Sequence, residues 1–213
     1  LMKNKFINFI LILLCLIFLS KNGSTNEPYI FDVTEIEILE NGNKIYGYKG
    51  GTATSIDGST FKAKNFFYNK LENILEATGD VIYFDKIKNI TISADKTIYF
   101  KNDEKIFTYN NSKAFSENNT ISASNLEYDK KLNIFKAKIN AEFNDYKKDT
   151  VIKADEISYS KNDEKIFTNG KTKAFVKNKY IFNSKNVFYF RNTQDLFSQH
   201  KSSVEDDNGN IYK

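Results

Sequence analysis

Apolar and polar residues recur along this chain with a period of about thirty residues. The octapeptide KNDEKIFT stands at 101–108 and returns at 161–168, and related segments begin near Phe61, Ile121 and Phe182. In each unit a small residue is followed five positions later by a tyrosine. These pairs are Ala63 and Tyr68, Ala94 and Tyr99, Ala123 and Tyr128, Ala154 and Tyr159, and Ser184 and Tyr189. A sixth, more divergent unit fits around Ile45-Tyr46, so the chain is a tandem array of one short module.

Each unit predicts two β-strands joined by a polar turn. The first half is rich in Ile, Phe, Tyr, Thr and Ser, which favour strands. Within it Ile121 and Ala123 share one parity and Leu126 takes the other, which predicts a bulge or bend between them. The second half alternates apolar and polar residues over 135–143, as a half-buried strand does. The segments between the halves, such as KNDEK and DKKLN, have turn compositions.

The fold class that follows is all-β. No helical stripe with i, i+3, i+4 spacing persists after residue 20, and no composition break divides the chain into two domains. Two strands per unit give about 11–12 strands in an antiparallel array, in which each unit buries its apolar face against its neighbours. The dipeptides Asn41-Gly42 and Asp57-Gly58 add hairpin signals to the first unit.

The amino terminus resembles a secretory signal. Lys3 and Lys5 precede a run from Phe6 to Leu19 in which only Asn8 is polar. We expect a signal peptide at 1–24 that is cleaved on export, with a retained anchor as the alternative, and a β domain at 25–213. Cys15 is read as part of the apolar run, so no disulfide is expected. The strand-like end at 211–213 predicts that the domain is truncated at its carboxy terminus.

Charge and motifs argue against several function classes. The formal net charge is +4, with both signs interspersed and no basic stripe, which argues against a nucleic-acid partner. The one histidine, His200, has no recognisable catalytic or metal-ligand spacing around it. The acidic pairs Asp103-Glu104 and Asp163-Glu164 fall in predicted turns, where solvated charge is expected. We therefore expect no enzyme activity, no metal and no cofactor.

The repeat resembles the OstA-like lipopolysaccharide-transport proteins. The segments that carry the resemblance are ISADKTIYF, IKADEISYS and LEATGDVIYF, and it covers roughly residues 29–213. The opening stretch 31–81 most resembles the periplasmic amino-terminal domain of the LptD branch. Only the copy at Leu75 keeps Ala-x-Gly-x-Val, and the barrel and paired cysteines of that branch are missing from this sequence, which fits a fragment and leaves a free-standing LptA-like or LptC-like relative open.

The resemblance implies a V-shaped antiparallel β-jelly roll, open along one side, with an apolar trough for acyl chains. It also implies a non-enzymatic conduit in the periplasm of a Gram-negative bacterium, associated with the outer membrane, that receives lipopolysaccharide and passes it outward. The implied partners are an LptA-like periplasmic bridge protein, paired along an edge strand at Tyr29–Leu39, and an outer-membrane barrel downstream. Ile36 and Ile38 are the expected partner contacts.

The residues expected to line the lipid trough come from both halves of the units. They are Leu75, Val81, Ile92, Phe107, Ile121, Phe135, Ile139, Phe143, Ile152 and Phe167. Periodicity alone cannot separate an open trough from a closed core. Two rival hypotheses therefore remain: a secreted adhesive or structural β-solenoid with a filled interior and exposed tyrosine ladders, and a carbohydrate-active β-helix enzyme with stacked acids.

Overall fold

The structure is a computed structural model that describes residues 28–213, so the expected signal segment lies outside the described residues. It contains one short 3₁₀ turn, Glu40–Gly42, and sixteen strands. The strands are β1 (Tyr29–Leu39), β2 (Lys44–Ser55), β3 (Thr60–Ala63), β4 (Asn65–Asn69), β5 (Ile74–Asp85), β6 (Ile90–Phe100), β7 (Lys105–Ser116), β8 (Asn119–Asp129), β9 (Ile134–Asp145), β10 (Thr150–Ser160), β11 (Lys165–Val176), β12 (Tyr180–Lys185), β13 (Phe188–Phe190), β14 (Asp195–Phe197), β15 (Ser203–Glu205) and β16 (Ile211–Tyr212).

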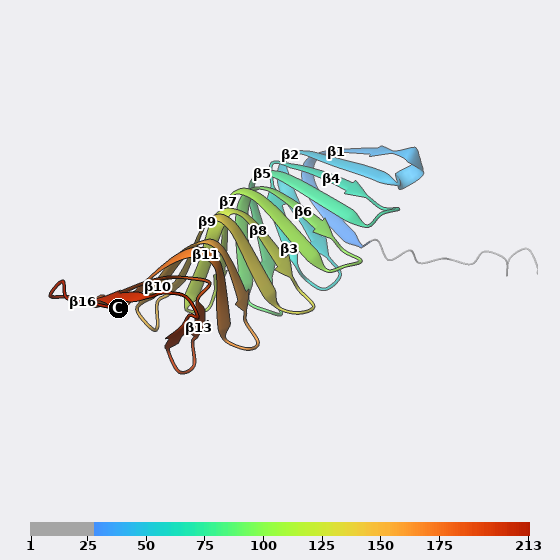
Figure 1. The fold of residues 1–213 in the computed structure, drawn as a ribbon. Coiled ribbons are helices and arrows are strands. Elements are labelled where there is room, and N and C mark those ends of the chain that lie inside the picture. Colours follow the sequence, from blue (N-terminus) through green and yellow to red (C-terminus); the bar gives the residue numbers. More distant parts are fainter. Residues whose placement is uncertain (1–27) are drawn as a thin grey trace, which may run out of the picture.

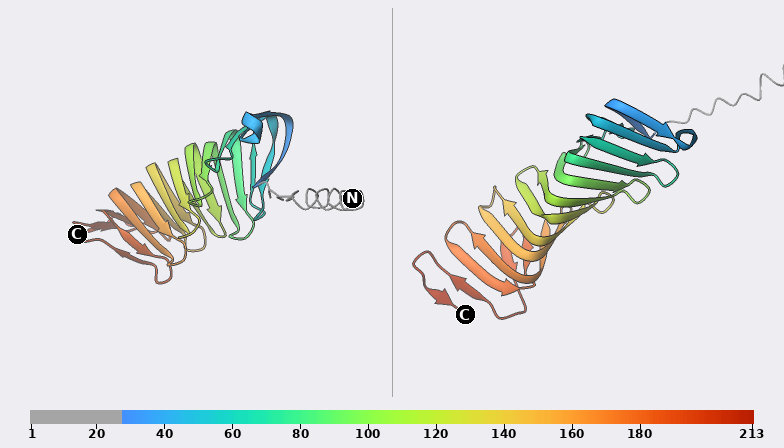
Figure 2. Two further views of the ribbon diagram at one scale, coloured as in Figure 1. Left: turned by 90° about the vertical axis from the view of Figure 1, so that its right-hand side faces the viewer. Right: turned by 90° about the horizontal axis from the view of Figure 1, so that it is seen from above.

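These strands form one continuous antiparallel sheet in which most sequence neighbours pair. They stack side by side along an elongated body, with the two ends of the sheet at opposite ends of the molecule (Figures 1 and 2). The all-β, antiparallel fold class is therefore confirmed. The strand count exceeds the expected 11–12 because two units are interrupted, giving the pairs β3/β4 and β12/β13, and because three short strands end the chain.

A bulge divides each long strand into two halves. On β8 the register shifts between Ser122 and Asn125, which confirms the bend expected from the change of parity in that unit. Similar shifts interrupt the pairing of β1, β5, β6, β7, β9, β10 and β11. Because the bulges lie side by side, the sheet folds along them into two wings. We call the half that contains β3 and β12 the first wing and the half that contains β4 and β13 the second wing.

The bulge also corrects one sequence prediction. The alternation over 135–143 does not run unbroken, because Ile139 and Asn140 adopt positive φ angles of 69° and 55° in the middle of β9. Glycine or asparagine occupies the position of Ile139 in β5 and β7, at Gly79 and Asn110, where φ is also positive. The bulge turns the Ile139 side chain outward, and it is 56% exposed.

The apolar core lies between the two wings and runs the length of the sheet. It is one cluster that extends from Tyr29 to Tyr189. No helix within residues 28–213 is long and apolar enough to cross a membrane.

Candidate functional site

Seven of the ten expected lipid-lining residues point between the wings. They are Leu75, Val81, Ile92, Ile121, Phe135, Phe143 and Ile152, and each is at most 2% exposed. They come from both wings, so the interior face predicted from the repeat is one continuous apolar surface.

Three of the expected residues lie elsewhere. Ile139 is displaced by the bulge described above, and Phe107 and Phe167 lie on the outer face of the second wing, half-buried. There Phe107 contacts Phe100, with ring centroids 5.6 Å apart, and Phe167 contacts Phe188 at 4.7 Å. Their assignment to the interior was wrong because a slip of one residue along a strand moves a side chain to the opposite face.

The inward residues that take their place are Ile106 and Ile166, both fully buried. The repeat carried the signal that identifies them. Each stands seven positions after the tyrosine of its own unit, as Leu75 stands after Tyr68. Counting seven positions from the tyrosine of each unit, rather than aligning the octapeptides, therefore identifies the residues that face the interior.

The tyrosine column forms an inner layer of this core. Tyr68, Tyr99, Tyr128, Tyr159 and Tyr189 are at most 3% exposed. The rings are packed in the core, and several hydroxyls reach the turns at the end of the second wing: that of Tyr128 donates to Asn133 Oδ1 at 3.1 Å and that of Tyr68 to Asn73 Oδ1 at 2.9 Å. The column is a core ladder and leaves no aromatic platform exposed at these positions.

The two wings meet through aromatic rings. Phe61 of the first wing lies 5.7 Å from Tyr99 of the second, and Phe143 lies 5.1 Å from Tyr159 (centroid distances). A third pair, Tyr29 and Tyr68, meets at 5.0 Å. Side chains thus occupy the space that the sequence analysis assigned to an unfilled trough. An acyl chain can enter this interior only if the wings move apart.

Opposite the bulges, the free ends of the wings are joined by a row of cations. We call this line the seam. A basic residue stands two positions after the tyrosine in every unit from Tyr68 onward: Lys70, Lys101, Lys130, Lys161 and Arg191. The backbone N–H of each donates to a carbonyl of the preceding turn on the same wing, at 2.8–3.1 Å. This regular anchoring places the cations at the edge of the second wing, and sequence reasoning missed their role although their spacing was visible.

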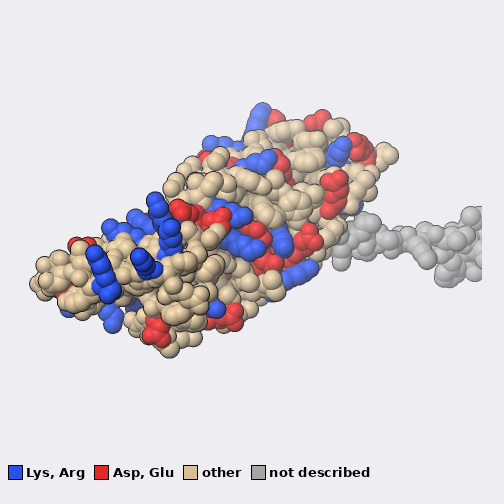
Figure 3. Space-filling model, viewed as in Figure 1, with Lys and Arg blue, Asp and Glu red and all other residues tan. Residues whose placement is uncertain are grey.

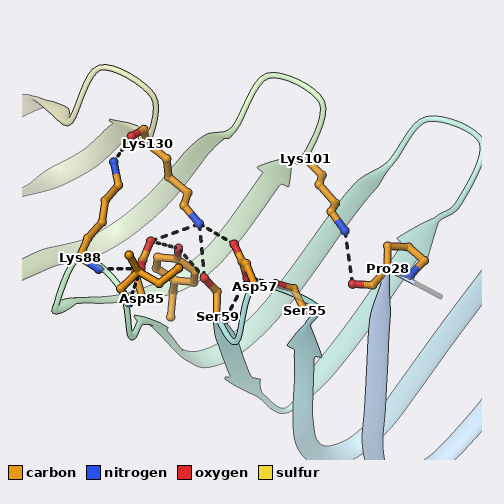
Figure 4. A network of polar contacts seen from close by, with 10 residues as sticks. Pro28, Ser55, Asp57, Ser59, Asp85, Lys88, Lys101 and Lys130 are labelled. Carbon is orange, nitrogen blue, oxygen red and sulfur yellow. Dashed lines mark hydrogen bonds and ion pairs between the residues drawn. The ribbon is translucent and has the colours of Figure 1, made fainter. Parts of the chain in front are cut away.

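Lys130 makes the most complete contact across the seam (Figure 4). Its Nζ lies 3.2 Å from Asp57 Oδ2 and 3.2 Å from Asp85 Oδ2, both at the edge of the first wing. It also donates to Ser59 Oγ at 3.3 Å, and Lys88 Nζ donates back to the Lys130 carbonyl oxygen. The side chains of Lys130 and Asp85 are 6% and 2% exposed, so this is a buried ion pair held by further hydrogen bonds.

The protonation states of this cluster favour a closed seam. Burial pushes the pKa of Asp57 upward, but the Ser55 hydroxyl, the Ser59 N–H and the Lys130 charge outweigh it and hold the pKa below its usual value. The pKa of Asp85 is lowered in the same way, because the Lys88 N–H and the Lys130 charge outweigh the upward effect of burial. Both carboxylates are therefore ionised at neutral pH.

The lysine itself stays charged. Burial lowers the pKa of Lys130, whereas Tyr99 and the charges of Asp85 and Asp57 raise it, and the net shift is upward. The ammonium lies 5.6 Å from the ring centroids of both Tyr83, on the first wing, and Tyr99, on the second. Lys130 thus covers the aromatic interior as well as joining the wings.

Arg191 repeats this arrangement nearer the carboxy-terminal end of the sheet. Its Nε donates to Asp145 Oδ2 at 2.7 Å across the seam, and its Nη1 donates to the Tyr159 hydroxyl at 3.0 Å and to Glu164 on its own wing. The guanidinium lies 5.9 Å and 5.8 Å from the ring centroids of Phe143 and Tyr159. Two cations therefore close the seam in the same way, each against a buried aspartate of the first wing.

We call the contacts of Lys130 and of Arg191 across the seam latches. The other cations of the seam make weaker contacts. Lys101 Nζ donates to the Pro28 carbonyl oxygen at 3.3 Å and lies 5.1 Å from the ring centroid of Tyr29, and burial lowers its pKa. Lys161 donates to the Lys88 carbonyl oxygen at 3.3 Å and forms a long, partly exposed ion pair with Glu117 at 3.8 Å. A hollow of about 380 Å³ lies here, lined among others by Lys88, Lys101 and Lys130.

At the amino-terminal end of the sheet, no described strand covers the interior face of the second wing. β1 pairs with β2 on one side only among the described strands. Ile36 and Ile38 lie opposite the inward-facing Gly47 and Ile45, and they are 52% and 58% exposed. The predicted edge strand is therefore present, and its apolar residues continue the interior face into solvent.

The residues considered for other chemistry are dispersed. His200 is exposed and its Nε2 lies 3.2 Å from Asn186 Nδ2. The acidic pairs at 103–104 and 163–164 lie in turns, as expected, and Glu164 contacts Arg191. Within residues 28–213 no cluster of three or more His, Cys, Asp or Glu side chains is placed to hold a metal ion.

Comparison with known proteins gives a structural likeness only. The sequence matches no protein-family model and no curated protein sequence. The structure is similar to the crystal structure of LptH, the LptA-homologous periplasmic component of the lipopolysaccharide transport device of Pseudomonas aeruginosa, with a TM-score of 0.49 and 14% identity over 53% of this chain and 82% of that one. It is also similar to the TCP10 domain of Danio rerio CPAP, with a TM-score of 0.18 and 9% identity over 84% and 98% of the two chains. At these values neither likeness assigns a function to this chain.

Proposed function

We propose that this chain is a non-enzymatic lipid conduit that holds acyl chains between its two wings. The observation that carries the proposal is the continuous apolar interior, which is covered along the seam by a few cationic side chains. Each buried methylene contributes about 0.8 kcal/mol, so a lipid with several chains gains enough to offset separation of the wings. The seam is the side on which the wings separate, because the bulges hold them together on the other.

The rival hypothesis of an adhesive solenoid requires exposed tyrosine ladders. The filled interior agrees with it, but the tyrosine column is buried in every unit from Tyr68 to Tyr189. The carbohydrate-active alternative requires acids that stack on one face, whereas the acidic pairs at 103–104 and 163–164 lie in turns. Both observations favour the conduit.

The finer proposal concerns cargo and place. The repeat motifs resemble OstA-like proteins, and on that basis we propose that the cargo is lipopolysaccharide and that the protein works in the periplasm, passing lipid toward the outer membrane. On the same basis residues 29–213 correspond to an LptD-type amino-terminal domain with a barrel downstream. A free-standing LptA-like or LptC-like bridge protein is the second candidate.

The interior role is tested by photo-crosslinking along one strand. A benzophenone amino acid at Phe135, which points inward, is expected to crosslink to lipid in cells. The same amino acid at Ile139, four residues along β9 but exposed on the outer face, serves as the matched control and is expected to give none. Lipid adducts are measured by mass spectrometry of the purified protein. Equal labelling at both positions, or none at Phe135 in a folded protein, rejects the conduit.

The edge strand is tested separately. A photo-crosslinker at Ile36 or Ile38 is expected to capture a periplasmic protein, because an unpaired strand edge with an exposed apolar face accepts a further strand. Ile30, on the same strand but on the opposite face because the bulge between Val33 and Glu35 intervenes, is 72% exposed and serves as the control. Silence at both Ile36 and Ile38, or equal capture at Ile30, rejects strand pairing at this edge.

A further inference from the structure

Lysines are concentrated without acids in one hairpin near the carboxy terminus. Between residues 165 and 185, which span β11 and β12, the sequence has six lysines and no Asp or Glu. Figure 3 shows Lys and Arg side chains protruding near this end of the molecule. The even mixture of charges over the whole chain conceals this local excess.

The lysines face one another on the outer surface of the first wing. Lys171 lies directly opposite Lys185 in the pairing of β11 with β12, and Lys173 lies directly opposite Lys153 in the pairing of β11 with β10. Directly opposite side chains in an antiparallel pair have Cβ atoms about 5 Å apart, and like charges in these positions destabilise the sheet. Stability of the sheet therefore gives no reason for this arrangement.

Three of these lysines line a hollow of about 570 Å³ on the outer face. Lys153, Lys171 and Lys173 line it together with polar residues such as Asn183 and Ser184. It is separate from the seam and from the interior.

One acid, Glu142, lines the hollow itself, and a second, Asp155, lies beside it. Glu142 pairs with Lys153 at 2.9 Å, and Asp155 Oδ2 accepts the backbone N–H of Lys171 at 3.0 Å. Lys171, Lys173 and Lys185 have no ion pair within the described residues. The hollow therefore keeps an excess of positive charge.

The repeat supplies an internal comparison. A smaller hollow of about 380 Å³ lies at the residues sixty positions earlier on β7 and β8, where it is lined by Asn111, Ser112 and Lys113 among others. Four lysine positions in the carboxy-terminal copy correspond to one lysine in the earlier copy. The corresponding residues are Lys153 and Ser93, Lys171 and Asn111, Lys173 and Lys113, and Lys185 and Ser124. Because the backbone motif is shared, the fold does not require the lysines, and Asp155 has its own counterpart in Asp95.

From this juxtaposition we propose that the hollow between β10, β11 and β12 binds phosphate-bearing anions. Several ammonium groups around a concave polar surface suit a compact group of high negative charge, since lysine binds phosphate as a point charge. A bound phosphate also relieves the repulsion between the opposed lysines. The anion is a phosphorylated lipid headgroup or a free phosphate compound. The site goes beyond the proposed conduit, because it lies on the outer face and needs no opening of the seam.

Titration of the purified chain with inorganic pyrophosphate at low ionic strength tests the site. The variant K171A/K173A is expected to bind about tenfold more weakly, because charge-assisted contacts are lost. The matched variant N111A/K113A changes the equivalent positions of the earlier hollow and is expected to bind within about twofold of the parent. Lys113 and Lys173 lie over Phe115 and Phe175 at 4.8 and 5.1 Å, so the two variants remove a similar cation–π contact, and the control also removes the donation of Asn111 Nδ2 to Asp95 Oδ2 at 3.0 Å.

Stability and transplantation provide independent readouts. K171A/K173A is expected to unfold at the same temperature or higher, because like-charge repulsion is removed. The variant S93K/N111K/S124K is expected to gain a second pyrophosphate site in the earlier hollow. Short-chain phosphatidic acid below its micelle concentration distinguishes the sources: tighter binding than pyrophosphate indicates a lipid headgroup, and weaker binding a free phosphate compound. The proposal is overturned if the parent chain does not bind pyrophosphate or if both alanine variants lose binding equally. This outcome is independent of lipid crosslinking at Phe135, which tests the conduit.

Discussion

Replacing Lys130 with alanine is expected to lower the free energy of unfolding by about 3 kcal/mol, near the lower end for a buried ion pair that loses one partner. The lysine is nearly inaccessible and faces two carboxylates across the seam. Its removal leaves Asp85 buried without a counter-charge, whereas Asp57 remains partly solvated. Chemical denaturation at pH 7 measures the change.

The neighbouring residue provides the control. Lys131 is exposed and donates to the Asn102 carbonyl oxygen at 3.3 Å on its own wing, so K131A is expected to change stability by less than about 0.5 kcal/mol. K130R is expected to retain most of the stability, because Arg191 fills the equivalent position and reaches a buried aspartate. Equal stability of K130A and K131A contradicts a structural role for the latch.

The latch also predicts how stability depends on pH. The folded pKa values of Asp57 and Asp85 are lowered, so their contribution is present above the unfolded value of about 3.9 and is lost as pH falls through the folded values. The pKa of Lys130 is raised, so its contribution is present below about 10.5 and is lost as pH rises through the folded value. The difference between the parent and K130A is therefore largest between about pH 4 and pH 10 and narrows in acid.

Covalent closure of the same latch is expected to abolish lipid uptake. A carbodiimide activates the partly exposed Asp57 carboxyl, and attack by Lys130 Nζ then forms an amide and releases the urea. The two groups are 3.2 Å apart, so the reaction is strongly favoured by proximity. An amide bond holds the wings together permanently, whereas separating an ion pair costs only a few kcal/mol. Loading of the delipidated protein with a fluorescent long-chain fatty acid is therefore expected to fall at least about tenfold.

The substitution K130R makes this experiment specific. Its guanidinium keeps the ion pair but does not form the amide, while exposed pairs such as Lys44–Glu40 and Lys64–Asp80 react in both proteins. Treated K130R is expected to load lipid as the untreated parent does. Peptide mass spectrometry verifies the bond between residues 57 and 130. Undiminished loading of the crosslinked parent shows that lipid does not enter through the seam.

Much of the fold could be predicted because its information is local and repeated. The thirty-residue period, the turn compositions and the parity change around residues 121–128 predict bent strands in an antiparallel array, as the pairing of β8 with β9 confirms. The same locality explains the errors. Phe107 and Phe167 are apolar residues next to the inward Ile106 and Ile166, and alternation alone cannot choose between two adjacent apolar residues. Ile139 was misplaced because a β-branched residue rarely adopts a positive φ.

The seam shows where prediction from the sequence ends. The basic column is visible in the sequence, but its partners are not, since Lys130 reaches Asp57 and Lys161 reaches the carbonyl of Lys88, each 73 residues away. The two partners of each contact belong to strands that are not neighbours in the sheet, and the strands between them account for the 73 residues of sequence. Which first-wing residue each cation reaches depends on how each bulge bends its strand and on how those bends add along the stack of strands.

The sequence by itself determined that this protein is a stack of bent two-strand units with one apolar face, because hydrophobic alternation, turn residues and the tyrosine period act within each unit. Only the tertiary structure decided that the apolar faces of the two wings pack against each other, that cations close the seam, and that lysines of two neighbouring strands line one hollow. These features depend on which strands become neighbours and on the angle between the wings, and both are set by the packing of all units together.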